Sequence, residues 1–88
     1  MISVTYEPGI PRLTLTGHAE HAPRGRDIVC AAASILAYTL TAGGAEAEEL
    51  RGGGLRLTGG RRDLELIAGG YRLLAENYPQ NIRFEVNE

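Results

Sequence analysis

Cys30 and His18 are the two residues of this chain whose types and spacing could carry out chemistry together. Cys30 is the only cysteine, and it stands near the start of an apolar, alanine-rich run. In the first turn of a helix, aligned peptide dipoles and free backbone N–H groups favour negative charge, which raises the thiolate fraction of a cysteine. His18 precedes Cys30 by twelve residues and could act as the base that a cysteine nucleophile needs. The pair therefore indicates nucleophilic catalysis by a thiolate.

Each of these residues also has a simpler interpretation. A free cysteine is often a small buried core residue, and a histidine at a strand end is often only a surface residue. His21 forms His-x-x-His with His18, and with Cys30 the two would give three potential metal ligands. Neither a second cysteine nor a nearby carboxylate pattern accompanies them. We therefore expect His21 to be a loop residue, and we expect neither a metal nor another cofactor.

Asp27 and Ser34 are the supporting candidates around the pair. Asp27 stands where the helix that carries Cys30 should begin, which favours a capping role for its side chain. It could instead orient His18 as the third member of a triad. Ser34 follows Cys30 by four residues and so lies on the same helical face one turn later. Its hydroxyl could hydrogen-bond near the active site or bond back to the carbonyl of Cys30, and the sequence leaves both open.

The elements that must position these residues follow from apolar periodicity. Residues 2–6 and 13–16 alternate apolar with polar side chains, and Glu7-Pro8-Gly9 between them marks a turn. They predict a β-hairpin that ends at Gly17-His18. Residues 19–26 have no periodicity, which indicates a mobile loop that closes over bound substrate.

A helix is predicted from Asp27 to about Thr41, where Gly43-Gly44 should stop it. This helix is apolar over most of its circumference, so it should be covered on more than one side. A domain of 88 residues has a modest core, so it has few residues left to cover a second side of this helix. The pattern therefore predicts another subunit there, in a homodimer.

The second half of the chain repeats the order of two strands and a helix. Residues 46–50 and 55–58 flank a glycine-rich turn, and residues 82–86 alternate as a final strand. Leu64, Ile67, Tyr71, Leu74 and Tyr78 are spaced as on an amphipathic helix that Pro79 ends. Gly69-Gly70 inside it predicts a close approach to the sheet or to the other helix. The order ββα-ββα-β predicts an α+β fold with two helices packed on a mostly antiparallel sheet, as a single domain over residues 1–88.

Composition excludes several classes of protein. Nine basic and eleven acidic residues give a net charge of −2, which leaves no electrostatic footprint for direct nucleic-acid binding. A single cysteine excludes an internal disulfide and fits a reducing compartment. The N-terminus lacks the pattern of a signal peptide, and no segment approaches the roughly 20 apolar residues of a membrane span. We therefore expect a cytoplasmic protein without a membrane partner.

The segment from Gly17 to Ser34 resembles the signature of the ribosomal-processing cysteine proteases, the Prp family. In that family a Gly-His-Ala triplet is followed by a variable loop and then by Gly-x-Asp-Ile/Leu-Val-Cys-Ala-Ala/Gly-x-Ser. The triplet is matched here by residues 17–19, and the second part by Gly25, Asp27, Ile28, Val29, Cys30, Ala31, Ala32 and Ser34. Glu76-Asn77-Tyr78, ahead of the last strand, also looks like the family.

This resemblance implies a cytosolic cysteine endopeptidase that works as a homodimer, with His18 and Cys30 as its catalytic residues. Its substrate would be a large-subunit ribosomal protein made with a short N-terminal extension, which is removed during ribosome assembly after an aromatic-rich apolar stretch. The short, glycine-rich second hairpin departs from the family. The alternative is a non-catalytic interaction domain, or an RNA-associated domain of the same fold, in ribosome biogenesis. The acidic balance disfavours RNA binding.

Overall fold

The computed structural model describes residues 1–17 and 27–88, in which seven elements follow one another. They are β1 (Ile2–Glu7), β2 (Arg12–Thr16), α1 (Asp27–Ala42), β3 (Glu46–Leu50), β4 (Gly54–Thr58), α2 (Arg61–Asn77) and β5 (Ile82–Val86). The predicted α+β order ββα-ββα-β is confirmed. The loop predicted over residues 19–26 lies outside the described residues.

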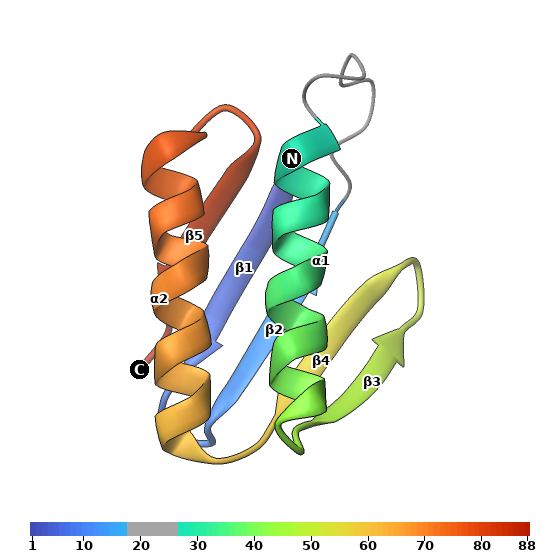
Figure 1. Ribbon diagram of the computed structural model, residues 1–88, viewed down its shortest axis with the longest axis vertical. Coiled ribbons are helices and arrows are strands. Elements are labelled where there is room, and N and C mark those ends of the chain that lie inside the picture. The colour runs from blue at the N-terminus through green and yellow to red at the C-terminus, as the bar shows by residue number, and fades with distance from the viewer. Residues whose placement is uncertain (18–26) are drawn as a thin grey trace.

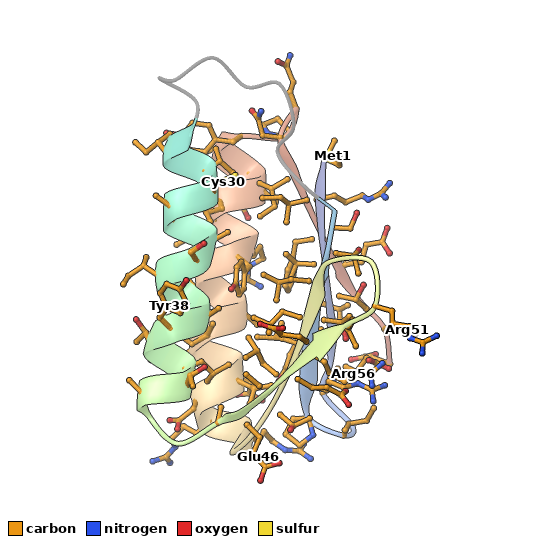
Figure 2. The ribbon with its side chains drawn as sticks, turned by 90° about the vertical axis from the view of Figure 1, so that its right-hand side faces the viewer. Met1, Cys30, Tyr38, Glu46, Arg51 and Arg56 are labelled. Carbon is orange, nitrogen blue, oxygen red and sulfur yellow. The ribbon has the colours of Figure 1, made fainter. Side chains whose placement is uncertain are left out.

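The five strands form one sheet in the order β3-β4-β2-β1-β5. Among the strands of residues 1–17 and 27–88, only β1 and β5 pair in parallel, so the predicted mostly antiparallel sheet is confirmed. Both helices lie on the same face of this sheet, as Figure 1 shows from the front and Figure 2 shows edge-on. The other face carries polar side chains, among them Arg56, which forms an ion pair of 3.0 Å with Glu48.

The core lies between the sheet and the two helices. Along β1, side chains alternate between buried and half-buried, and the register places Val4 opposite Leu15 and Tyr6 opposite Leu13. Complete burial of one such aliphatic side chain stabilises the fold by about 1.5–3 kcal/mol. The buried core consists of Ile2, Val4, Tyr6, Leu13, Val29, Ala33, Ala37, Leu40, Leu57, Leu64, Ile67, Ala68, Tyr71 and Ile82.

A glycine and a tyrosine of α2 fix its position against α1. A Cβ added to Gly70 would lie 2.8 Å from Cδ2 of Leu36, so the helices approach closely at this residue. One residue later, the buried hydroxyl of Tyr71 donates a 2.8 Å hydrogen bond to the carbonyl oxygen of Ala33. Gly69, by contrast, has no atom within 4 Å of an added Cβ. The predicted close approach is thus correct for Gly70 and wrong for Gly69.

The outward side of α1 is exposed in this chain. Ile28, Ile35 and Tyr38 are 57%, 59% and 67% exposed, although α1 has no charged residue after Asp27. On α2, Leu73 is 59% exposed beside them and lines the same shallow groove as Ile35. We call Ile35, Leu36, Leu73 and Leu74 the outer helical face. No helix of the described residues is both long and apolar enough to cross a membrane.

Candidate active site

Cys30 is the fourth residue of α1 and therefore lies in its first turn. The first four N–H groups of a helix have no partner within the helix and point toward its N-terminal end. The Cys30 side chain is half-buried and packs against the edge of the core, so its position is fixed while part of it stays accessible. The thiol is thus held where a negative charge is stabilised.

A groove of about 570 Å³ runs beside Cys30 between α1 and the sheet. Its lining consists of Ile2, Leu15, Gly17, Cys30, Ala33, Ser34, Ala37, Tyr38, Gly53, Gly54 and Leu55. None of these residues is charged, and most of the lining is apolar. Figure 2 shows Cys30 near the N-terminal end of α1 and Tyr38 farther along the helix. The arrangement can hold an apolar, extended chain next to a thiol.

One face of α1 forms the wall of the groove. Cys30, Ser34 and Tyr38 are spaced by four residues and so lie above one another on this face. The small side chains of Ala33 and Ala37 leave space between them and the sheet. Tyr38 is not among the predicted site residues, although its spacing from Cys30 and Ser34 is a signal that could have identified it.

Two glycines allow the strands to approach the groove closely. Gly17 has a φ of 85°, and an added Cβ would collide with the carbonyl oxygen of Met1. Only glycine therefore fits where the chain leaves β2, directly before His18. At the start of β4, a Cβ on Gly54 would lie 2.9 Å from the carbonyl oxygen of Leu15. This second glycine lets the β3–β4 turn lie against the groove.

Only some of the predicted site residues fall within the described part of the chain. Cys30 and Ser34 lie together on the groove wall, and Asp27 is the first residue of α1. His18 and His21 lie outside the described residues, so the pairing of His18 with Cys30 and the role of Asp27 stay predictions. Residues 1–17 and 27–88 contain no group of three His, Cys, Asp or Glu side chains that could hold a metal.

Ser34 differs from the two threonines of α1 in its hydrogen bonding. Within the described residues it makes no hydrogen bond, whereas Thr39 and Thr41 on the same helix bond back to the carbonyls of Ile35 and Ala37. Of the two roles left open for Ser34, a bond to the carbonyl of Cys30 is not formed in this structure. Ser34 is exposed and lines the groove one turn from the thiol.

Comparison with known proteins bears on the origin of this site. The sequence profile of a family described as cysteine protease Prp matches residues 1–53, which is more than half of the chain. The matched part includes β1, β2 and α1 with Cys30, and it ends in the β3–β4 turn. No curated protein matches the chain.

Solved structures share the whole fold. The essential ribosomal processing protease Prp from S. aureus, in complex with a covalently linked product peptide, aligns with a TM-score of 0.79 at 24% identity, over 99% of this chain and 100% of that one. The same protease with a substrate peptide gives 0.77 at 22% identity, again over 99% and 100%. SMU.848 from Streptococcus mutans gives 0.70 at 26% identity, over 97% of this chain and 90% of that one.

A cysteine in the first turn of a helix, at an uncharged groove in this α+β fold, together with the matched profile, defines a cysteine protease. The chain belongs to the cysteine protease Prp family.

Proposed function

We propose that this chain is an endopeptidase that removes a short N-terminal extension from a large-subunit ribosomal protein during ribosome assembly. The position of Cys30, in the first turn of α1 beside an apolar groove, carries the proposal. Membership of the Prp family supports it, as does the likeness to an S. aureus ribosomal processing protease that binds substrate and product peptides. Residues 1–88 act as one catalytic domain in this proposal.

In the first step, the thiolate Sγ of Cys30 attacks the scissile carbonyl carbon and forms a C–S bond. The carbonyl oxygen takes the negative charge and accepts hydrogen bonds from free N–H groups in the first turn of α1, which act as an oxyanion hole. The protonated imidazole of His18 donates its proton to the leaving nitrogen as the C–N bond breaks. The result is a thioester and a released peptide with a new N-terminus.

In the second step, His18 takes a proton from a water molecule, and the water oxygen attacks the thioester carbon. The C–S bond then breaks, which returns Cys30 as the thiolate and releases a carboxylic acid that loses its proton to the solvent. No metal or cofactor takes part. Asp27 acts at the start of α1, either as its cap or as the group that orients His18. Ser34 contacts the bound peptide one helical turn from the thiol.

The groove sets the substrate class of this reaction. Cys30 and Tyr38 are eight residues apart on α1, so about 12 Å of helix lies between them. An extended peptide advances about 3.3 Å per residue, and roughly four residues therefore fit along this length. Ile2, Leu15 and Leu55 give the groove an apolar floor, and its lining has no charge. These properties favour an apolar or aromatic stretch of the extension next to the cleavage site.

The experiment is cleavage of a peptide that carries the extended N-terminus, followed by mass spectrometry of the products. The wild-type chain should cut the peptide once, whereas Cys30→Ala should bind it without cutting because the nucleophile is absent. His18→Ala should lower turnover by about 10²–10⁴-fold. His21→Ala is the matched control, because it removes a histidine only three residues away in the sequence, and it should leave turnover nearly unchanged.

Three outcomes would decide against this function. Cleavage of the peptide by Cys30→Ala would contradict the thiolate mechanism. Cleavage that requires an added metal would also contradict it. Binding without cleavage by the wild-type chain would favour the non-catalytic interaction domain.

Asp27→Asn separates the two roles of Asp27, because asparagine still caps a helix well. A large loss of turnover in that variant would assign Asp27 to the orientation of His18.

The active form in this proposal is a cytoplasmic homodimer that forms through the outer helical face. Ile35 and Leu73 are both 59% exposed, and a groove of about 320 Å³ runs between α1 and α2 beside them. An uncharged apolar face can pack against its own copy without bringing like charges together. The reduced thiol that Cys30 needs fits the reducing cytoplasm.

A further inference from the structure

A second cavity lies apart from the groove, and the proteolytic mechanism does not use it. It has a volume of about 370 Å³ and lies between α2 and the strands β1 and β5. It shares no lining residue with the groove at Cys30. The cavity reaches β5 and the groove reaches the β3–β4 turn, and Figure 1 shows these elements at opposite edges of the sheet. This volume is within the usual range for a small-molecule site.

Tyr6 gives the cavity a buried polar group without a partner. The residue lines the cavity and is only 7% exposed, and its hydroxyl has no hydrogen-bond partner within the described residues. Burial raises the pKa of Tyr6, and the nearby charge of Glu65 raises it further. The hydroxyl therefore keeps its proton at neutral pH and can donate to a ligand. Buried polar groups in native proteins nearly always have a partner, so this one needs an explanation.

Gly69 keeps the space beside Tyr6 open. It stands in the middle of α2, where glycine is less favourable than alanine, and nothing lies within 4 Å of an added Cβ. Its neighbour Gly70 lies in close contact with Leu36, but no such contact explains Gly69. Gly69 lines the cavity, and a larger side chain at this position would fill part of it.

Two opposite charges flank Gly69 along α2. Glu65 precedes it by four residues and Arg72 follows it by three, so their Cα atoms are about 10 Å apart along the helix. Both line the cavity, and within the described residues neither forms an ion pair. Pro8 and Phe84 add apolar surface. Glu88 adds a second carboxylate to the lining. The lining thus combines one cation, two carboxylates, a hydroxyl and an apolar wall.

We propose that this cavity binds a free α-amino acid with an apolar or aromatic side chain. The guanidinium of Arg72 binds the ligand carboxylate, which also accepts a hydrogen bond from Tyr6. The carboxylate of Glu65 binds the ligand ammonium group. The ligand side chain packs against Phe84 and Pro8. This assignment does not depend on the proposed proteolysis.

The test is a titration of the full chain with L-phenylalanine, followed by NMR chemical shifts. Resonances of Tyr6, Gly69 and Arg72 should shift and saturate with a Kd of about 1 mM, which is typical of a small ligand with few contacts. Two analogues separate the charges: 3-phenylpropionate lacks the amino group, and 2-phenylethylamine lacks the carboxylate. Each should bind about tenfold more weakly, because each leaves one charged side chain without its partner.

Variants locate the site. Gly69→Leu fills the cavity with a good helix former, so it should fold and should lose binding. Arg72→Gln should weaken binding about tenfold, because the carboxylate loses a charged partner. The matched control is Arg62→Gln, an exposed arginine of the same helix, which should bind as the wild type does. Tyr6→Phe keeps the ring but removes the hydroxyl, so it should weaken binding. If Tyr6→Phe fails to fold, Gly69→Leu still tests the site.

Several results would overturn the assignment. If no NMR resonance shifts at about 10 mM phenylalanine, ten times the expected Kd, the cavity does not bind this amino acid. Equal binding of phenylalanine and both analogues would mean that the cavity recognises only an apolar body. Unchanged binding by Gly69→Leu would place the ligand elsewhere. None of these results bears on cleavage of the ribosomal-protein peptide, so the two proposals can fail separately.

Discussion

At Cys30, the helix terminus and the groove act on the same sulfur atom. The N–H groups in the first turn of α1 have no partner within the helix, and the half-buried Cys30 side chain lies beside the groove. An inert core cysteine would need neither property. The same local geometry therefore has a consequence for thiol reactivity that can be measured without any substrate.

The first prediction concerns the rate of alkylation of Cys30. At pH 7 an ordinary free thiol is mostly protonated, with a pKa of about 8.5, and reacts slowly with iodoacetamide. The folded chain should react faster than the same chain unfolded in urea, because unfolding removes the helix terminus. The measurement is the alkylation rate in both states by mass spectrometry. Slower reaction of the folded chain would mean that burial outweighs activation.

The second prediction concerns Gly17, which ends β2 directly before His18. Gly17→Ala should lower the free energy of unfolding by more than about 1 kcal/mol, because alanine is unfavourable at this positive φ. The new Cβ would also collide with the carbonyl of Met1. Urea unfolding measures the loss, and turnover should fall with it because His18 is displaced. Gly9→Ala is the control, since nothing lies within 4 Å of its Cβ.

At the scale of elements, the contact between α1 and α2 determines how the groove wall stands over the sheet. Gly70 meets Leu36, and the Tyr71 hydroxyl bonds to the carbonyl of Ala33. Ala33 also lines the groove, three residues after Cys30. The packing of α2 against α1 therefore positions the groove wall through one buried hydrogen bond and one close helix contact.

Adjacent glycines in α2 give the third prediction. Gly69→Ala should raise the free energy of unfolding by about 0.4–1 kcal/mol, because the space is open and alanine is the better helix former. Gly70→Ala should raise the free energy of unfolding by less, or lower it, because Leu36 must move away from the new Cβ. Thermal or urea unfolding of both variants measures the difference. Equal gains would show that Leu36 moves at no cost.

Tyr71 gives the fourth prediction, which concerns alkaline pH. Burial raises the pKa of Tyr71 well above 10, its ordinary value, so the folded state keeps the proton that the unfolded chain loses. The stability due to this group is complete below pH 10 and falls as pH rises above 10. Tyr71→Phe should cost about 1 kcal/mol at pH 7 through the lost hydrogen bond, and its stability should fall less above pH 10. Urea unfolding at both pH values tests this, with the exposed Tyr38→Phe as control.

Most of the local structure was predictable from the sequence. The alternation of Ile2, Val4 and Tyr6 predicted β1, and the spacing of Leu64, Ile67 and Tyr71 predicted α2, because burial on one side of an element imposes its period. Cys30 near the start of α1 was predictable for the same reason: the apolar run of α1 begins just before it.

The order of the strands and the shape of the groove were not predictable. The parallel pairing of Ile2 with Ile82 joins residues from the two ends of the described chain, and no local pattern specifies it. The groove floor requires Leu15 and Leu55 to be neighbours, which follows only from the β2–β4 pairing. Gly69 was misjudged because its role depends on a space beside the helix and not on a contact.

At the scale of the whole molecule, the exposed side of α1 differs from the sheet in charge. The exposed side of α1 has no charge after Asp27, whereas ion pairs such as Arg12–Glu7 and Arg56–Glu48 lie on the strands. Figure 2 shows Arg56 on the side of the sheet away from the helices. The outer helical face is therefore the part of the described surface best suited to pack against a second copy.

The fifth prediction is that this face forms the homodimer. Sedimentation equilibrium at micromolar concentration should give twice the 9.5 kDa chain mass, and added salt should not weaken the association, because no charges are paired across the face. Ile35→Lys should give a monomer. Val86→Lys introduces the same charge at an apolar residue that is 52% exposed on β5, and it should stay dimeric. A monomeric wild-type chain would contradict the assignment.

The parallel pairing of β1 with β5 also has a consequence for synthesis. A chain that is still attached to the ribosome has made β1 and β2 long before residues 82–86 appear, so β1 keeps one open edge meanwhile. At 5–20 residues per second, this interval lasts about 3 to 13 s. Ile2, which pairs with Ile82, is also part of the groove floor. A nascent chain therefore lacks a finished groove, and proteolysis by this protein begins only after its last strand has been translated and has docked.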